Sequence, residues 1–276
     1  TVDLDAGTAT DGFGDGDTLS NIENITGTDQ ADQLTGSDAA NVVLGNAGDD
    51  IISGLDGADT LVGGLGADTI AGGEGADVIS GGEGADQIAG DAGSDTIVGG
   101  LGADTIDGGA GIDEIDYSTD AAAGGDAGVT VDLDAGTATD GFGDSDTLSN
   151  IENITGTDQT DQLTGSNDAN VILGNAGDDI ISGLGGADTV DGGSGIDEVD
   201  YSTDATAGGT AGVTVDLNSG TATDGFGNQD QLSNIENIRG TNESDIIIGD
   251  SAANVLSGLS GEDKIYGGAG ADIIDA

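Results

Sequence analysis

The 276-residue chain contains no cysteine, histidine, proline, methionine or tryptophan, and only two basic residues, Arg239 and Lys264. Without cysteine there are no disulfides, and without cysteine or histidine the usual ligands of zinc, copper and haem are missing. The lack of proline also argues against proline-rich linkers. Carboxylate and carbonyl oxygens are the metal ligands that remain, and they favour calcium or magnesium.

The shortage of basic residues also limits the partners that the chain can bind. Against two basic residues stand 55 Asp and Glu, which give a formal net charge of -53. Nucleic acids and anionic membrane surfaces require basic patches, so we expect neither as a partner. Such a charge disfavours any compact state unless cations enter it. We therefore expect counter-ions to be part of the folded structure.

Long apolar runs are absent as well. No stretch of about 18 apolar residues occurs, so we expect no membrane insertion, and no basic-then-apolar signal segment stands at Thr1. The 56 glycines argue against long helices, because each glycine inside a helix costs roughly 1 kcal/mol. Turns and short strands are the structures that this composition favours.

What the chain does have is a nine-residue repeat. Eight copies follow one another from Gly45 to Asp116 without a register error, among them GLDGADTLV and GGLGADTIA. Position 6 is always Asp and position 8 is always a large aliphatic residue. The glycines at positions 1, 2 and 4 suit a tight turn, and positions 7 to 9 suit a short strand with one side chain pointing inward. Because such a short strand cannot stand alone, successive strands must stack in parallel.

The repeats form three arrays, which predict one continuous scaffold over residues 1–276. Its sub-units are 1–128 with nonapeptides at 27–116, 129–212 with nonapeptides at 156–200, and 213–276 with nonapeptides at 240–275. Two similar joining segments, 117–155 and 201–239, connect the arrays.

The nonapeptide resembles GGxGxDxUx, the repeat of the RTX (repeats-in-toxin) calcium-binding β-roll. The resemblance covers nearly the whole chain. It implies an all-β, elongated, right-handed parallel β-roll, which is a calcium-stabilised β-solenoid with two nonapeptides per turn. Each calcium ion then lies between one loop and the equivalent loop one turn later. For one such site the implied ligands are the carbonyl groups of Gly64, Gly66, Gly81 and Glu83 and the carboxylates of Asp68 and Asp86.

The resemblance extends the metal assignment to the Asp at position 6 of each array. The uninterrupted array contributes Asp50, Asp59, Asp68, Asp77, Asp86, Asp95, Asp104 and Asp113. The later arrays contribute Asp179, Asp188, Asp197, Asp263 and Asp272. Three further candidates, in first nonapeptides whose position 4 is not glycine, are Asp32, Asp161 and Asp245.

In the second nonapeptide of each array, position 6 is an asparagine: Asn41, Asn170 and Asn254. A neutral amide oxygen is expected to weaken the calcium site there or to leave it empty.

The spacing of the long repeat varies by whole nonapeptides. The interval from Thr130 to Thr214 is shorter than the interval from Thr1 to Thr130 by five nonapeptides. With two nonapeptides per turn, that difference is two and a half turns. We therefore expect the strands at Val131 and Val215 to be related to the roll axis differently from those at Val2 and Val131, unless the joining segments break the winding.

The resemblance implies a secreted or cell-surface bacterial protein, exported unfolded and folded by extracellular calcium. We expect a structural role in an adhesin, a surface layer or an extracellular filament, with self-association into fibres or surface arrays as a further partner interaction. The alternative is a non-catalytic RTX module attached to a secreted lipase, protease or polysaccharide-modifying enzyme. Without calcium the acidic, glycine-rich chain is expected to be disordered, because metal binding must supply part of the folding free energy.

Other functions are less well supported by the sequence. Acidic pairs such as Asp49-Asp50 are explained as repeat residues, so no catalytic activity is expected. Ice binding would need uninterrupted threonine rows at position 7, and these rows contain other residues. The aromatic residues of the joining segments are expected to form an apolar plug, with sugar stacking as the alternative. They are Phe13, Phe142 and Phe226 together with Tyr117 and Tyr201.

Overall fold

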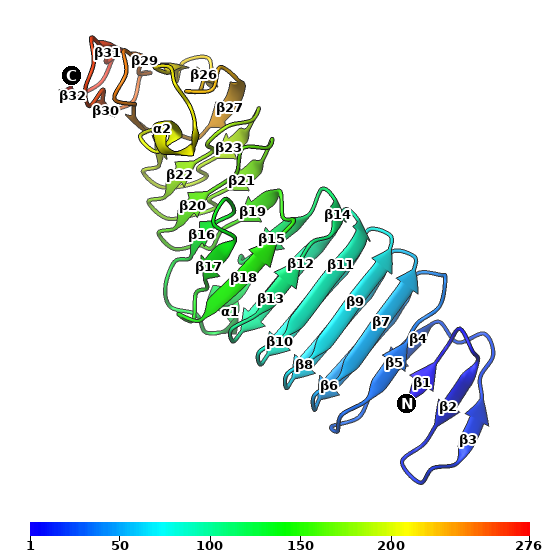
Figure 1. Ribbon diagram of the computed structural model, residues 1–276. Coiled ribbons are helices and arrows are strands. Elements are labelled where there is room, and N and C mark those ends of the chain that lie inside the picture. The colour runs from blue at the N-terminus through cyan, green and yellow to red at the C-terminus, as the bar shows by residue number, and fades with distance from the viewer. The chain divides into compact units, whose positions relative to one another are not determined.

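The computed structural model describes all 276 residues and divides them into two compact units. The N-terminal unit contains Thr1–Asp120 and Gly136–Ile151, and the C-terminal unit contains Ala121–Ala135 and Glu152–Ala276. Each unit is built from short parallel strands that follow one another as turns of a β-roll (Figure 1), so the predicted fold class is confirmed. No helix has the length and apolar character needed to cross a bilayer.

Two parallel ladders form the N-terminal unit. In each ladder a strand pairs with the equivalent strand one turn later, as Leu61 does with Ile79 and Ile79 with Ile97. One ladder runs β5-β7-β9-β11-β13-β18 and the other β4-β6-β8-β10-β12-β15. The strands of this unit are β1 (Val2–Asp3), β2 (Thr8–Thr10), β3 (Gly16–Thr18), β4 (Asn24–Thr26), β5 (Gln33–Thr35), β6 (Val42–Ala47), β7 (Ile51–Asp56), β8 (Thr60–Leu65), β9 (Thr69–Glu74), β10 (Val78–Glu83), β11 (Gln87–Gly93), β12 (Thr96–Leu101), β13 (Thr105–Asp107), β14 (Ala110–Gly111), β15 (Glu114–Asp116), β17 (Thr137–Thr139) and β18 (Ser145–Ser149).

The core of each unit is a stack of the aliphatic residues at position 8. Leu61, Ile79 and Ile97 are fully buried, whereas the neighbouring position-7 residues Ile51 and Val78 are more than half exposed. Strand geometry causes this difference, because successive side chains point to opposite faces of a strand. Each buried Leu or Ile contributes about 1.5–3 kcal/mol.

Most strands have the three residues that the repeat predicts, but the strands from β6 to β12 are longer. They have six or seven residues and continue into the first part of the following loop, where Gly64 pairs with Gly82. The loop backbones can approach closely enough to pair because glycine has no side chain there. The uninterrupted array is therefore bonded between turns through its loops as well as its strands.

The C-terminal unit repeats this plan. One ladder runs β16-β20-β22-β24-β28-β30-β32, and the other contains β19-β21-β23-β27 and β25-β29-β31. The helix α2 (Asp204–Ala207) lies in this unit, and α1 (Asp120–Ala123) lies at the boundary of the two units. The strands are β16 (Thr130–Asp132), β19 (Asn153–Thr155), β20 (Gln162–Thr164), β21 (Val171–Leu173), β22 (Ile180–Ser182), β23 (Thr189–Asp191), β24 (Glu198–Asp200), β25 (Thr214–Asp216), β26 (Thr221–Thr223), β27 (Gln229–Ser233), β28 (Asn237–Arg239), β29 (Ile246–Ile248), β30 (Val255–Ser257), β31 (Lys264–Tyr266) and β32 (Ile273–Asp275).

The joining segments continue the ladders and add antiparallel strands to them. In the C-terminal unit β25, β26 and β27 form an antiparallel meander, and Gln231 of β27 stacks on Thr189 of β23. In the N-terminal unit β17 and β18 form the corresponding hairpin, and β18 stacks on β13. Val131 in β16 and Val215 in β25 lie in opposite sheets of the C-terminal unit, in keeping with the half-turn difference in repeat spacing.

Candidate metal centres in the repeat loops

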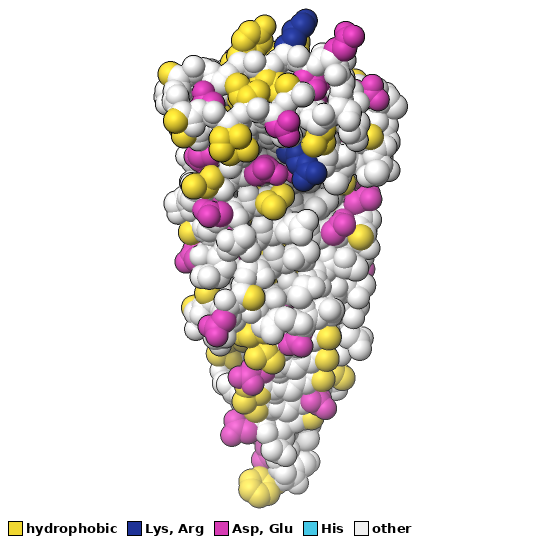
Figure 2. Space-filling model, turned by 90° about the vertical axis from the view of Figure 1, so that its left-hand side faces the viewer, with side chains coloured by type: hydrophobic (Ala, Val, Ile, Leu, Met, Phe, Trp, Pro, Cys, Tyr) yellow, Lys and Arg dark blue, Asp and Glu magenta, His cyan; other side chains and the backbone are white.

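The Asp at position 6 of the repeats points inward, where each loop meets the following strand. Asp68, for example, is only 1% exposed. A buried carboxylate is costly unless both of its oxygens find a partner. The partners of these oxygens therefore decide what the loops can bind. On the face shown in Figure 2, the exposed acidic side chains form separate spots among hydrophobic side chains, uncharged polar side chains and backbone.

One carboxylate oxygen of each repeat Asp is held by the backbone of the preceding turn. The Asp50 amide donates to Asp68 Oδ1 at 2.7 Å, and the Asp68 amide donates to Asp86 Oδ1 at 2.8 Å. The same bond recurs from turn to turn in both units. The nonapeptide pattern does not predict this contact, because the contact depends on the register between turns.

The second carboxylate oxygen has no hydrogen-bond partner in most of these residues. A buried acceptor left in this state loses its hydration and gains nothing in return. Such an oxygen is therefore suited to a cation. The residues with a buried, unbonded Oδ2 are Asp50, Asp59, Asp68, Asp77, Asp86, Asp95, Asp104, Asp179, Asp188, Asp197 and Asp263.

Backbone carbonyl groups lie beside these oxygens, between one loop and the equivalent loop of the next turn. Asp68 Oδ2 and the carbonyl oxygen of Gly81 both lie against Gly63, so close that a Cβ atom on Gly63 would collide with them. A Cβ on Gly82 or Gly84 would meet the carbonyl oxygen of Gly64 or Gly66, respectively. The Glu83 carbonyl lies in the same gap, where it accepts the Gly66 amide at 2.8 Å. The carbonyls of Gly64, Gly66, Gly81 and Glu83 thus lie between consecutive turns, with the Gly81 carbonyl beside Asp68 Oδ2, and calcium coordination by this ligand set stays a prediction.

The first Asp of each array has different surroundings. The Thr157 amide donates to Asp161 Oδ2 at 2.7 Å and the Thr157 hydroxyl donates to Oδ1 at 2.8 Å, while the Val129 amide also donates to Oδ1. Asp245 has the same set of donors, and Asp32 accepts the amide and hydroxyl of its own loop threonine. These three carboxylates are bonded within the protein in a way that the regular repeats are not.

At position 6 of the second nonapeptide in each array, an asparagine amide stands where the regular repeats have a carboxylate. Asn41 Oδ1 accepts the Ser37 amide at 2.7 Å, and its Nδ2 donates to the Glu23 carbonyl of the preceding turn at 2.7 Å. Asn170 and Asn254 make the equivalent bonds. Because the amide nitrogen saturates a carbonyl oxygen in the gap between turns, these loops are internally satisfied.

Burial raises the pKa of the repeat carboxylates. Desolvation is the largest cause, and neighbouring carboxylates add to it, whereas the backbone amide bond opposes it. The pKa reaches about 6 at Asp86, about 7 at Asp104 and Asp179, and about 8 at Asp188. The loops therefore favour a positive charge beside these groups.

No three Asp or Glu side chains form a metal-binding group in the structure. The gaps between repeat loops differ from such a side-chain group, because backbone carbonyl oxygens as well as carboxylates face them. Calcium accepts such mixed oxygen ligands, usually six to eight of them.

Comparison with known protein families agrees with this chemistry. The model of the RTX calcium-binding nonapeptide repeat matches residues 17–52, 26–61, 53–88, 80–115, 150–177, 164–199 and 235–276, which together cover more than half of the chain. The chain belongs to the RTX calcium-binding nonapeptide repeat family. A search of curated proteins finds no match. The RTX repeats are calcium-binding repeats typical of secreted proteins.

The RTX ladder also includes residues that the nonapeptide pattern did not reveal. Asp146 Oδ1 accepts the Asp104 amide at 3.0 Å, as a repeat Asp would, and Glu236 Oε2 accepts the Asp197 amide at 3.0 Å. A shorter motif was available in the sequence, since Asp146-Thr147-Leu148 has the same Asp, outward and aliphatic order as positions 6 to 8.

The aromatic residues for which a plug is predicted differ in how deeply they are buried. Tyr117 and Tyr201 are fully buried, which agrees with the predicted plug. Phe226 is half-buried and lies 3.7 Å from a Cβ added to Gly208 after α2. Phe13 is 94% exposed, so it does not form the predicted plug in this structure.

Proposed function

We propose that this chain is a structural region that folds on binding many calcium ions outside the cell. The buried, unbonded Oδ2 atoms of the repeat Asp residues are the observation that carries the proposal. Bound calcium supplies the positive charge that these carboxylates lack. Asp68 and the carbonyls of Gly64, Gly66 and Gly81 are typical of the groups that would hold it.

The proposed role is that of a scaffold in an adhesin, surface layer or extracellular filament, with no catalytic activity of its own. Three features support this role. The chain is repetitive over most of its length, many of its acidic side chains lie in the repeat loops, and the core of each unit is a stack of its own aliphatic residues. Self-association into fibres or surface arrays belongs to the same proposal.

A calcium titration followed by circular dichroism tests coupled folding. We expect a disordered spectrum in chelator and a strand spectrum in excess calcium, with a much weaker response to magnesium, which demands a regular octahedral shell and dehydrates reluctantly. Full strand signal in excess chelator at neutral pH would contradict the proposal. Electron microscopy of the calcium-loaded protein tests self-association, since single separate particles at high concentration would count against fibres.

A further inference from the structure

A second group of buried carboxylates lies outside the regular loops of the C-terminal unit. Asp188, Asp204 and Asp224 are each 1% exposed, and Asp230 is 3% exposed. They come from the residue before β23, the start of α2, the residue after β26 and the strand β27. The β25-β26-β27 meander brings them near the Tyr201 hydroxyl, which donates to Asp230 Oδ2 at 3.3 Å.

Hydrogen bonds fix this carboxylate cluster in place. The Asp188 amide donates to Asp230 Oδ1 at 3.2 Å, and the Gly225 amide donates to Asp204 Oδ2 at 2.8 Å. Asp224 Oδ1 accepts two amides of its own turn, from Phe226 and Asn228. The four carboxylates are close enough that the charges of Asp230, Asp224 and Asp204, in addition to burial, raise the pKa of Asp188.

The N-terminal unit contains the same carboxylate cluster. The Tyr117 hydroxyl donates to Asp146 Oδ2 at 3.0 Å, the Asp104 amide to Asp146 Oδ1 at 3.0 Å, and the Gly141 amide to Asp120 Oδ2 at 2.9 Å. Asp140 completes the set and is 1% exposed. The same arrangement thus occurs once in each unit, each time in a joining segment.

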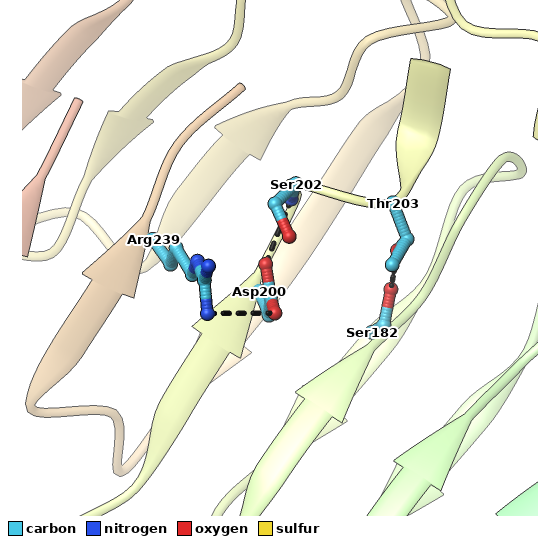
Figure 3. A network of polar contacts seen from close by, with 5 residues as sticks. All are labelled: Ser182, Asp200, Ser202, Thr203 and Arg239. Atoms are coloured by element: carbon cyan, nitrogen blue, oxygen red, sulfur yellow. Dashed lines mark hydrogen bonds and ion pairs between the residues drawn. The ribbon is translucent and has the colours of Figure 1, made fainter. Parts of the chain in front are cut away.

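No basic side chain neutralises the cluster in the C-terminal unit. Arg239 lies 3.9 Å from Asp200, whose other oxygen accepts the Ser202 amide, at the position shown in Figure 3. Beside them Ser182 and Thr203 bond to each other. Lys264 is exposed in β31. Four buried carboxylates therefore stand without a compensating side-chain charge, an arrangement that proteins normally avoid.

Both clusters contain buried oxygens that bond to nothing. Outside the repeat loops, these oxygens are Oδ2 of Asp140 in the N-terminal unit and Oδ1 of Asp204 in the C-terminal unit. Each such atom belongs to a side chain that is no more than 2% exposed. Hydrogen bonding within the protein leaves these atoms unused, although their neighbours in the same cluster are bonded.

We propose that each joining segment holds a calcium site of its own, distinct from the repeat-loop sites. Its ligands are Asp120, Asp140 and Asp146 in the N-terminal unit and Asp204, Asp224 and Asp230 in the C-terminal unit. Asp104 and Asp188 neighbour this site, but their unbonded Oδ2 atoms face the last regular loops. All six proposed ligands lie outside the segments that match the RTX repeat.

The chemistry of the cluster selects a hard divalent cation. Every side-chain ligand is a carboxylate oxygen, and the chain has no histidine or cysteine to supply a nitrogen or sulfur ligand. No three of these carboxylates stand at metal-ligand spacing in the structure. The proposal therefore requires the unbonded oxygens of Asp140 and Asp204 to move towards the neighbouring carboxylates when the cation binds.

Terbium luminescence provides a selective test, because terbium replaces calcium and is sensitised by a nearby tyrosine. The chain has three tyrosines and no tryptophan, and two of the tyrosines donate to a cluster carboxylate. We expect tyrosine-excited terbium luminescence in the full chain, with displacement by calcium. The double variant Asp140→Asn/Asp224→Asn should lose most of it and bind two fewer calcium ions per chain by equilibrium dialysis.

The matched control is Asp5→Asn/Asp126→Asn, which removes the same charge from two exposed residues outside the nonapeptide arrays. It should keep both the luminescence and the number of bound ions. If the Asp140/Asp224 variant does the same, the proposal is wrong.

A second variant covers the case in which the Asp140/Asp224 variant does not fold in calcium. Tyr117→Phe/Tyr201→Phe removes the sensitisers but leaves the carboxylates, so luminescence should disappear while the number of bound calcium ions stays the same. Undiminished luminescence, which would then come from the exposed Tyr266, would overturn the proposal. Calcium binding by the wild-type repeat loops is measured separately, so failure here does not affect the proposed function.

Discussion

At the scale of the residue, the two oxygens of one carboxylate have different roles. In Asp68, Oδ1 accepts the amide of Asp50 in the preceding turn, while Oδ2 is buried beside the Gly81 carbonyl with no hydrogen bond. The first contact fixes the side chain, and the second oxygen is left for a cation. A single Asp thereby links the geometry of the roll to its need for metal.

Replacing Asp68 with Asn tests this division of roles. Asp68→Asn keeps an acceptor for the Asp50 amide but removes the charge, so we expect at least one fewer calcium ion per chain or a local affinity lower by roughly tenfold or more. Asp161→Asn is the matched control, because Thr157 and Val129 already bond both of its oxygens. Native mass spectrometry counts the ions. Equal losses in the two variants would contradict the distinction.

The asparagines near the start of each array lead to the opposite prediction. In Asn41→Asp a carboxylate oxygen replaces the Nδ2 that donates to the Glu23 carbonyl, so both atoms become acceptors in a buried gap. We expect this variant to need more calcium to fold and, once folded, to bind one additional ion. A calcium titration with ion counting checks both effects, and an unchanged ion number would show that the gap cannot accept a cation.

The sequence predicts the roles of some residues in the candidate metal sites and not those of others. Position 6 and its carbonyl neighbours follow from the nonapeptide, because the same residue recurs at the same place in each turn. The roles of Thr157 and Asn41 do not follow, since their partners are set by backbone register rather than by residue type. The carboxylate cluster is harder still, because Asp188 and Asp230 are far apart in the sequence and meet only through the antiparallel meander.

At the scale of the element, the loop backbones limit the choice of residue more than the strands do. The strands vary between Ile, Leu and Val at position 8 and remain buried. In the loops, Gly63 has no space for a methyl group, since Asp68 Oδ2 and the Gly81 carbonyl occupy it. The fold class is predictable from the strands, and the close contact between loops explains why glycine recurs in them.

Gly63→Ala tests the loop contact. The backbone of Gly63 does not have a positive φ, so the effect is steric rather than conformational. We expect a loss of about 1–3 kcal/mol of stability in saturating calcium, the usual cost of overpacking. Thermal unfolding measures it. Gly16→Ala is the control, because nothing lies within 4 Å of an added Cβ there, and a similar loss in both variants would refute the steric explanation.

At the scale of the whole molecule, the proposed calcium-dependent folding rests on the distribution of charge. The net charge of -53 is concentrated in part on buried carboxylates whose pKa is raised, mainly by burial. Protons and calcium are therefore alternative ways to relieve the same repulsion. The RTX family and the fold both follow from the repeat, whereas the proposed dependence on cations is inferred from where the charges lie.

Acid should partly replace calcium. The pKa of Asp104, Asp179 and Asp230 rises in the fold from the ordinary value of 3.8 to about 7. The folded chain therefore binds more protons than the unfolded chain between these values, so its stability falls as pH rises through this window and recovers on acidification. In excess chelator we expect the strand signal in circular dichroism to increase on acidification from mildly alkaline to mildly acidic pH. A flat or falling signal would contradict the expectation.

The bond between each carboxylate and the amide one turn earlier also gives the roll a polarity. When a turn is added at the C-terminal side, its Asp carboxylate accepts the backbone amide of a turn that is already folded. When a turn is added at the N-terminal side, its backbone amide donates to a carboxylate that is already in place. Each array begins with loops whose Asp and Asn side chains are hydrogen-bonded within their own loop. We expect ordering to propagate from these starting turns towards the C-terminus, so amide exchange after a calcium pulse should slow first near Asp32 and Asn41 and near Asp161 and Asn170. Simultaneous protection along the whole array would show that the polarity has no kinetic effect.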